Sequence, residues 1–560
     1  MVERRTAAHL LIDMLREAGV DRVFGVPGGP LLSLLDTMST RPGIEFVLAK
    51  HEEGAVFMAE GHAQATGRLG VALVTAGPGA THALTAAASA TSDGVPLLVL
   101  AGQVPAAHVG RGALQDSSGG NWALDTVDMF RSATKAAMAV TDVVQLAFMV
   151  RRAVQTATTS LPGAVLLNVS GDVLVAAEPA VAPRTVHRDP PRSARPEEVR
   201  ELVTRIVAAR CPVILAGRGA KSSVGIGDLV ALAERREIPV ATTMKGKGAF
   251  PEGHRLSLGV FGNYGGSAAT HGRVLGDDVD LLVVLGSSLG EVSTFGWDPR
   301  LVQGRTVVQV DLDPLQLGRG FPVDQALLAD AGSLVTDLLK ALPSSSSSRS
   351  LSGRERLSAD VLQGDHPLLR ASALAARLSE TLPDDVSLFV DNGNALCWIG
   401  EHYVARPGTS IHVSLNVGCM GYAIPAAIGA RMAQPARPVV AVVGDAAFAM
   451  LGMEIHTAVE YRQSVIWIVL NNGGNGMVAN LQELMFGSAP GSRYAHRLDV
   501  ATVARGLGAR AAVANDLESF DRALGTALAE GGPWLVDARV DGDEVPWSLR
   551  GRAEMLRATT

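Results

Sequence analysis

The stretch Pro438–Met477 decides the fold; it reads PVVAVVGDAAFAMLGMEIHTAVEYRQSVIWIVLNNGGNGM. Two short apolar runs in it, Pro438–Val443 and Val465–Leu470, are rich in β-branched residues and predict buried parallel strands. Gly452–Arg462 between them predicts a helix, which completes a strand–helix–strand unit. Because ligands of open parallel sheets bind outside the carboxyl ends of the strands, we expect a site where these two strands end.

The residues at the two strand ends have the chemistry of a magnesium diphosphate site. Gly444-Asp445 follows the first strand, and Asn471-Asn472 follows the second. Mg²⁺ takes oxygen ligands, commonly one or two from side chains together with phosphate oxygens. Asp445, the side-chain oxygen of Asn472 and the carbonyl of Gly474 supply such oxygens. The glycines of both turns would let the backbone approach a diphosphate closely.

The order Gly444-Asp445-Ala446, with Asn472 27 positions after Asp445, resembles the metal and diphosphate motif of thiamine diphosphate (ThDP) enzymes. The alternative is an Asp and an Asn that end buried strands in any α/β domain; the family more often has Gly at Ala446. The resemblance implies that ThDP and Mg²⁺ are cofactors, with Asp445, Asn472 and Gly474 as metal ligands. It implies cofactor-binding roles in this region for Gly444, Asp445, Ala446, Ala447, Asn472, Gly474, Asn475, Gly476 and Met477.

The composition limits the classes to which the protein can belong. The chain has 560 residues, a formal net charge of −7 and 47% hydrophobic residues, which predicts several globular domains. The acidic balance argues against nucleic acid or an anionic membrane as partner. Charged residues interrupt the N-terminal helix, so we expect no signal peptide, and no apolar run approaches the roughly 20 residues of a membrane span. Three cysteines without metal or disulfide spacing fit a reducing cytoplasm.

Two breaks in composition divide the chain. Glu178–Pro196 is rich in Pro and Arg, and Pro343–Arg354 is rich in Ser. The segments around them alternate short apolar runs with longer amphipathic helices, which is typical of parallel sheets covered on both faces. We predict an α/β fold of three doubly wound parallel-sheet domains at 1–177, 197–342 and 360–550. By resemblance these are the pyrimidine-binding, central nucleotide (FAD)-binding-like and diphosphate- and metal-binding domains.

An acidic pair, Glu52-Glu53, ends a predicted strand just before the predicted helix Ala55–Thr66. Such pairs are ordinarily helix-dipole partners. In ThDP enzymes a glutamate at this place hydrogen-bonds the aminopyrimidine of the cofactor and favours removal of the thiazolium C2 proton. The resemblance therefore implies that Glu52 is catalytic, with Glu53 the less favoured candidate. Pro27 and Gly28, in a glycine turn after the first predicted strand, are included among the cofactor-binding residues.

The run Val71–Pro105 resembles the acetohydroxyacid (acetolactate) synthase family closely. His82 stands where that family commonly has Asn; it is either a titratable group near the cofactor or a helix-end polar residue. Gln115 and Lys135 match positions that line the substrate channel of the family, although a lone Gln or Lys is usually a solvated surface residue. By this resemblance Gln115 is expected to be catalytic.

The central domain resembles the FAD-binding domain of the same family. The family carries an arginine that contacts FAD in one strand-end turn, but the turn here reads Gly286-Ser287-Ser288-Leu289-Gly290-Glu291. Two alternatives stay open, a flavin-free domain and a bound FAD without a redox role.

The turn Gly418-Cys419-Met420-Gly421 precedes an Ala-rich predicted helix, and simple packing would account for it. By resemblance, the Gly418 carbonyl contacts the 4′-amino group of the cofactor. Met420 props the bent cofactor and so serves catalysis by orientation. Leu481 replaces a tryptophan that shapes the acceptor pocket of branched-chain enzymes, which implies a different acceptor.

The resemblance covers residues from about 15 to 550 and implies an acetolactate synthase-like carboligase. The expected partners are a 2-oxo acid donor, with pyruvate favoured, and a carbonyl acceptor. The family also implies a homodimer or homotetramer with active sites at subunit interfaces. Two alternatives are a simple 2-oxo acid decarboxylase or lyase and a non-catalytic ThDP-fold protein. The presence of Glu52, Asp445 and Asn472 argues against the latter.

Overall fold

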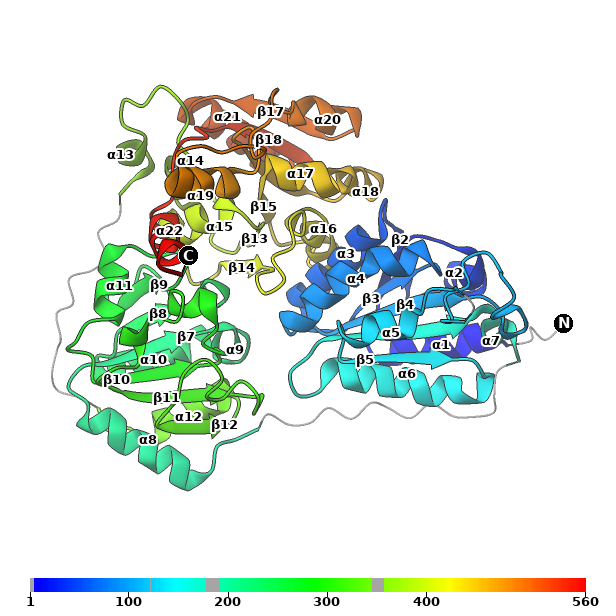
Figure 1. Ribbon diagram of the computed structural model, residues 1–560, viewed down its shortest axis with the longest axis horizontal. Coiled ribbons are helices and arrows are strands. Elements are labelled where there is room, and N and C mark those ends of the chain that lie inside the picture. Colours follow the sequence, from blue (N-terminus) through cyan, green and yellow to red (C-terminus); the bar gives the residue numbers. More distant parts are fainter. Residues whose placement is uncertain (1–4, 121, 178–191, 345–356, 560) are drawn as a thin grey trace.

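Three parallel sheets form the protein, one after another along the chain (Figure 1). The computed structural model describes residues 5–120, 122–177, 192–344 and 357–559. The predicted three-domain α/β fold is confirmed, since each sheet has six strands and every strand pairing is parallel. Most of the two composition breaks lies outside the described residues, although Pro196 itself begins a helix.

The first sheet has the strand order β2-β1-β3-β4-β6-β5. Its strands are β1 (Arg22–Gly25), β2 (Glu45–Leu48), β3 (Gly70–Val74), β4 (Leu97–Gln103), β5 (Ala136–Val140) and β6 (Ala164–Ser170). Its helices are α1 (Ala7–Glu17), η1 (Gly29–Leu31), α2 (Leu32–Thr40), α3 (Glu52–Thr66), α4 (Pro78–Ser92), η2 (Ala106–His108), α5 (Thr126–Arg131), α6 (Val143–Thr158) and α7 (Gly171–Val175).

The central sheet has the order β12-β11-β10-β7-β8-β9. Its strands are β7 (Pro212–Ala216), β8 (Val240–Thr242), β9 (Ser257–Val260), β10 (Leu281–Leu285), β11 (Thr306–Asp311) and β12 (Gln325–Leu328). Its helices are α8 (Pro196–Ala208), α9 (Arg218–Ser223), α10 (Ile226–Arg236), η3 (Met244–Gly246), α11 (Ala268–Val274), η4 (Glu291–Thr294), η5 (Pro299–Leu301) and α12 (Ala331–Ala341).

The third sheet has the order β14-β13-β15-β16-β18-β17. Its strands are β13 (Ser387–Val390), β14 (Ser410–Val413), β15 (Val439–Gly444), β16 (Val465–Asn471), β17 (Arg510–Ala514) and β18 (Trp534–Arg539). Its helices are α13 (Ala359–Gln363), α14 (Ala371–Thr381), α15 (Asn394–His402), α16 (Ala423–Ala433), α17 (Asp445–Leu451), η6 (Gly452–Glu454), α18 (Ile455–Glu460), α19 (Gly476–Phe486), α20 (Val500–Gly506), α21 (Leu517–Glu530) and α22 (Trp547–Thr559).

The topology fixes where a ligand can bind. In each sheet the first strand has later strands on both sides, so the chain reverses direction across the sheet beside that strand. Such switch points lie between β1 and β3 in the first sheet and between β13 and β15 in the third. Crevices at the carboxyl ends of these strand pairs are the usual ligand sites of doubly wound sheets.

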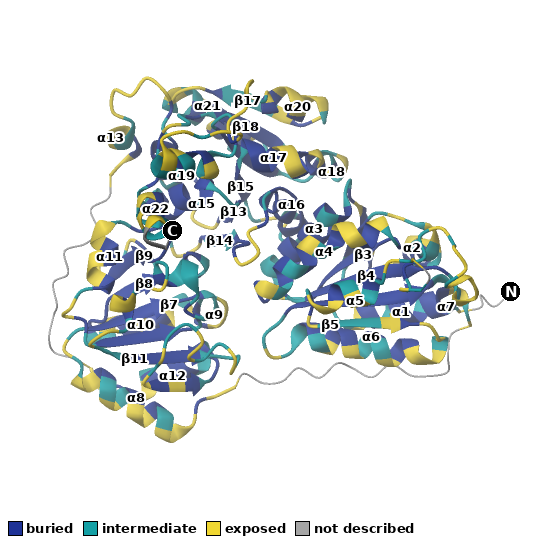
Figure 2. Ribbon diagram, in the orientation of Figure 1, coloured by how far each residue is buried: buried dark blue, intermediate teal, exposed yellow. Residues whose placement is uncertain are grey.

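The first and third domains share one hydrophobic core. Helices α3 and α16 pack against each other in the centre of the molecule, and both are buried along most of their length (Figures 1 and 2). Two glycines permit this close approach. A Cβ on Gly61 would lie 2.0 Å from the Ala426 carbonyl oxygen, and one on Gly429 would lie 1.9 Å from that of Met58. Neither helix can turn away from the other without exposing this core.

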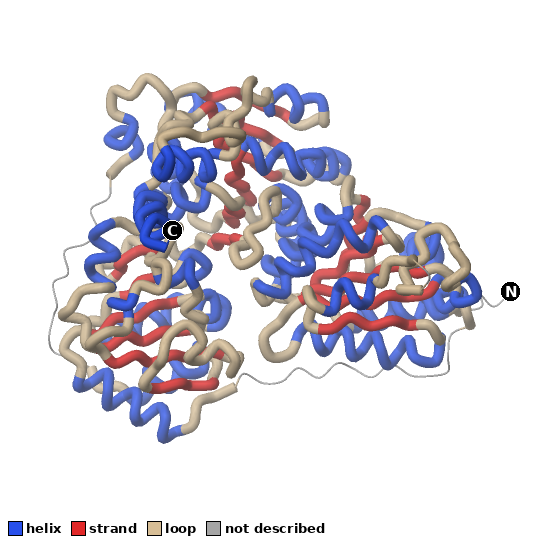
Figure 3. The backbone as a smooth tube through the Cα atoms, viewed as in Figure 1, coloured by secondary structure: helices blue, strands red, loops and turns tan. Residues whose placement is uncertain are grey.

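Helices surround each sheet, and loops gather at the strand ends (Figure 3). The predicted helix Gly452–Arg462 is wrong in its start, because the chain enters α17 directly at Asp445 and continues through η6 into α18. Across the described residues, no helix is both long enough and apolar enough to cross a bilayer.

Candidate active site

The carboxyl ends of β15 and β16 bring the expected metal ligands together. The strands pair with Gly444 opposite Leu470, so Asp445 and Asn472 emerge from the same edge of the sheet. Asp445 is fully buried, and its Oδ2 accepts hydrogen bonds from the backbone N–H groups of Gly473 (3.0 Å) and Gly474 (2.9 Å). Burial raises the pKa of Asp445 to about 6, against the opposing effect of these backbone donors. Its Oδ1 is turned towards Asn472.

The Asn472 side chain completes a set of three oxygens. Its terminal amide atom lies 3.0 Å from the Gly474 carbonyl oxygen and 3.1 Å from Asp445 Oδ1. With nitrogen in that place, the amide donates to both oxygens. With oxygen there, the Asn472 oxygen stands about 3.0 Å from each of the other two oxygens. That separation is the edge length of an octahedron with metal–oxygen distances of about 2.1 Å. The donor set therefore fits Mg²⁺. Asn471 differs, because its side chain donates to Leu498 O and Asp537 Oδ1.

The remaining residues expected at the diphosphate lie beside these three oxygens, which we call the Asp445 cradle. Ala446 and Ala447 are buried in the first turn of α17. Asn475 donates its N–H to Ser492 O, and α19 begins at Gly476 and Met477. A Cβ on Gly476 would lie 1.9 Å from Asn472 Nδ2, so only glycine leaves room for the amide.

The turn with Gly418 and Met420 is held by two residues that the sequence analysis missed. Asp391, directly after β13, accepts hydrogen bonds from Gly421 N–H at Oδ1 (2.9 Å) and Ala423 N–H at Oδ2 (2.8 Å). Asn392 donates its amide to the Cys419 carbonyl (2.6 Å). Burial raises the pKa of Asp391 to about 7. Both residues stand at the switch point beside β15, and that position in a parallel sheet was the signal that could have found them.

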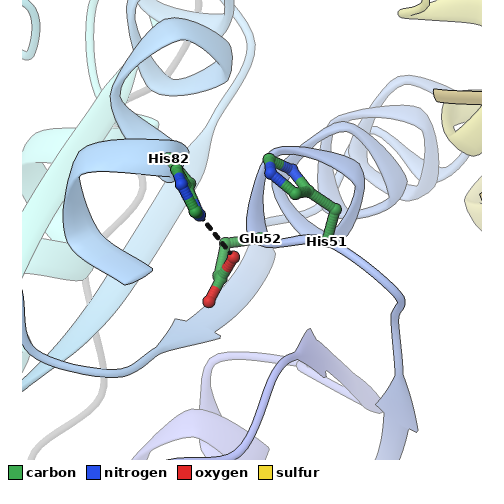
Figure 4. Close-up of side chains that lie close together, drawn as sticks. All are labelled: His51, Glu52 and His82. Atoms are coloured by element: carbon green, nitrogen blue, oxygen red, sulfur yellow. Dashed lines mark hydrogen bonds and ion pairs between the residues drawn. The ribbon is translucent and has the colours of Figure 1, made fainter. Parts of the chain in front are cut away.

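A second cluster forms in the first domain around Glu52 (Figure 4). Glu52 is the first residue of α3 and is buried, and its Oε2 lies 2.9 Å from Nδ1 of His82 on α4. A Cβ on Gly79, in the first turn of α4, would lie 3.3 Å from Glu52 Oε1. His51 caps α3, because its Nδ1 accepts from the Glu53 N–H. Glu52, not Glu53, therefore faces α4.

Other expected residues of the first domain lie at the same edge. Gln115, with φ +62°, packs beside Gly77 at the start of α4. Pro27 and Gly28 follow β1, and a Cβ on Gly28 would collide with Thr75 Oγ1, which follows β3. Thr75 Oγ1 is buried and has no hydrogen-bond partner within the described part of the protein.

Lys135 does not join this cluster. Its ammonium group donates to the carbonyls of Thr159 (2.9 Å) and Leu161 (2.7 Å) and so stabilises the segment after α6. These bonds give Lys135 a structural role, and its place in a substrate channel stays a prediction.

The central domain differs from the family at the turn expected to contact FAD. The turn Gly286–Glu291 follows β10 at the switch point with β7, and it supplies no arginine of its own. Arg218, the first residue of α9, donates to Gly94 O of the first domain. Arg319 reaches the turn from elsewhere, within 3.9 Å of the position of a Cβ on Gly290. This turn therefore lacks the arginine expected to contact FAD, and the arginines near it come from other segments.

Comparisons with known proteins agree with this geometry. Three family models match in succession: the thiamine pyrophosphate enzyme N-terminal binding domain at residues 5–121, the central domain at 199–339 and the C-terminal binding domain at 391–538. The fold and its two clusters define a thiamine pyrophosphate enzyme, as the sequence predicted.

Curated relatives narrow the class further. The acetolactate synthase large subunit of Lactococcus lactis is 30% identical over 86% of this chain and 83% of its own length. The acetolactate synthase of Arthrospira platensis is 30% identical over 97% and 95%, respectively. Acetolactate synthase isozyme 3 large subunit of Escherichia coli is 29% identical over 98% of both chains. The chain belongs to the acetolactate synthase family of thiamine pyrophosphate enzymes.

Proposed function

We propose that the protein decarboxylates pyruvate and joins the remaining two-carbon unit to an acceptor carbonyl. The observation that carries the proposal is the similarity to acetolactate synthases along nearly the whole chain, together with the presence of Glu52, Asp445 and Asn472 in this sequence. Bound ThDP supplies the carbon nucleophile and the electron sink for loss of CO₂. The reaction involves no net oxidation, so a flavin has no redox task in it.

Each cluster has a separate task in this proposal. Asp445, Asn472 and the Gly474 carbonyl hold Mg²⁺ and, through it, the diphosphate. The Gly418 carbonyl and Met420 orient the cofactor, and Asp391 fixes their turn. Glu52 presents its carboxyl group to the aminopyrimidine ring.

We further infer that two subunits complete each active site, as a dimer or tetramer. The Glu52 side chain is bonded to His82 of its own domain, while the Asp445 cradle lies in the third domain. A mixture of Glu52→Gln and Asp445→Ala subunits tests this. If sites form between subunits, random pairing restores about one quarter of wild-type turnover, because half the dimers carry one intact site. No restoration would place each site within one chain.

Product analysis tests the reaction. Purified protein with ThDP, Mg²⁺ and pyruvate should release CO₂ and form acetolactate or another acyloin, identified by mass. Acetaldehyde alone would replace the proposal by a simple decarboxylase, and the absence of CO₂ would exclude pyruvate as donor.

Leu481 favours an acceptor other than a second pyruvate. It lies half-buried on α19, five positions after Gly476. A leucine leaves more room than the tryptophan of branched-chain enzymes, and pocket volume separates small apolar substituents. Competition between pyruvate and larger aldehydes or ketones should favour the larger acceptors, and Leu481→Trp should reverse that preference. A cytoplasmic location and the absence of nucleic acid as partner stay predictions.

A further inference from the structure

The carboxyl group of Glu52 has two differently placed oxygens. Oε2 meets His82 Nδ1 at 2.9 Å (Figure 4). Oε1 lies near Gly79 in the first turn of α4, 3.3 Å from the position that a Cβ there would take. The Glu52 side chain is 12% exposed, but that of His82 is 47% exposed. Within the single chain the imidazole therefore connects a buried carboxyl group to solvent, while the second oxygen is left for another partner.

His51 supports this ring without competing for the carboxylate. Its ring stacks on that of His82, with centroids 4.6 Å apart and planes 28° apart. Its Nδ1 accepts the Glu53 N–H, so this nitrogen carries no proton. Burial, reinforced by the nearby His82, lowers the pKa of His51. A neutral His51 thus acts as a platform for the His82 ring.

Three other acidic or basic side chains lie around the pair, and two of them are engaged elsewhere. Glu454 of η6 accepts the N–H groups of Lys50 and His51, and burial raises its pKa. The Lys50 ammonium forms an ion pair with Glu460 of α18. Burial also raises the pKa of Glu53, against the attraction of the nearby His82. His82 is the side chain that bonds Glu52 directly.

We propose that His82 is a positioning residue that fixes Glu52 and exchanges protons between its carboxyl group and solvent. The proton on Oε2 passes to Nδ1, and the resulting imidazolium releases the proton on its Nε2 to water. One proton leaves and a carboxylate remains, with no change in electron count. The inference rests on the proposed function, because it gives Glu52 a means to reset after each proton exchange with the aminopyrimidine.

The discriminating variant is His82→Asn, because asparagine can hold Oε2 by a hydrogen bond but cannot relay a proton. His108→Asn, at an exposed histidine of η2, is the matched control. In holoenzyme with Mg²⁺, exchange of the cofactor C2 proton for deuterium should slow about tenfold or more in His82→Asn. Its dependence on pH should flatten, added imidazole should restore part of the rate, and ThDP affinity should change little. An unchanged exchange rate and pH profile would overturn the proposal.

A second readout needs neither cofactor nor turnover. In cofactor-free protein labelled with ¹⁵N-histidine, the resonances absent from His82→Asn identify His82, and they should shift in Glu52→Gln. Unshifted resonances would show that the two groups do not interact, and would also overturn the proposal. Exchange of the C2 proton requires no pyruvate. A wild-type protein that exchanges this proton but forms no acyloin would therefore refute the proposed function and leave the role of His82 standing.

Discussion

Replacing Gly476 by alanine displaces an expected metal ligand without changing the chemistry of any ligand. The new Cβ would lie 1.9 Å from Asn472 Nδ2, and an ordinary contact begins near 3.4 Å, so the amide must move by about 1.5 Å. Metal–ligand distances tolerate only about 0.2 Å. Gly476 begins a helix and its φ is not positive, so alanine suits the backbone and the protein should fold normally.

We expect the apparent Mg²⁺ affinity of Gly476→Ala to fall by about 10- to 100-fold, or about 1.4–2.8 kcal/mol, with little change in melting temperature. The assay measures ThDP binding by calorimetry at increasing Mg²⁺ concentrations. Gly525→Ala is the matched control, since Gly525 lies within α21 and a Cβ there meets nothing within 4 Å. Wild-type Mg²⁺ dependence in a folded Gly476→Ala protein would refute the assignment of Asn472 as a ligand.

Three further predictions follow from buried groups. Glu52→Gln should retain ThDP but slow C2 proton exchange greatly; unchanged exchange, measured by NMR, would remove Glu52 from its proposed role. Asp391→Ala leaves the N–H groups of Asn392, Gly421 and Ala423 without their acceptor, which costs about 1–3 kcal/mol for each group. Amide hydrogen exchange at residues 418–423 should therefore become faster, and ThDP affinity should fall. Exchange that stays as slow as in the wild type would contradict this prediction. Burial lowers the pKa of His62 to about 4, against the attraction of Asp21. As pH falls below about 6.5, His62 therefore takes up a proton in the unfolded chain before it does so in the folded protein. This lowers the free energy of unfolding by roughly 2 kcal/mol between pH 7 and 5. Chemical denaturation of His62→Gln at both pH values should not show this loss.

Much of the fold was predictable because its signals are local. The β-branched runs of β15 and β16 identify buried parallel strands, and their polar ends mark the ligand edge. The start of α17 was missed because Asp445–Leu451 is apolar on most sides and shows little amphipathic period.

Side-chain partners were less predictable, because they depend on distant segments. Nothing near Lys135 in the sequence indicates that the carbonyls of Thr159 and Leu161 approach its ammonium group. Asp391 directly follows β13, but its role depends on a turn about 30 residues later. From the sequence, His82 is either a group near the cofactor or a helix-end polar residue, and the structure places its ring against Glu52.

The contact of Glu454 with the backbone of Lys50 and His51 has a consequence for how such chains can evolve. A carboxylate more than 400 positions away orders the residues that lead into Glu52, so the start of α3 depends on the third domain. The donors are backbone N–H groups, so a chimera that takes residues 1–177 from a distant relative should keep this contact as long as Glu454 is present. Loss of Glu454, in contrast, should misplace the start of α3.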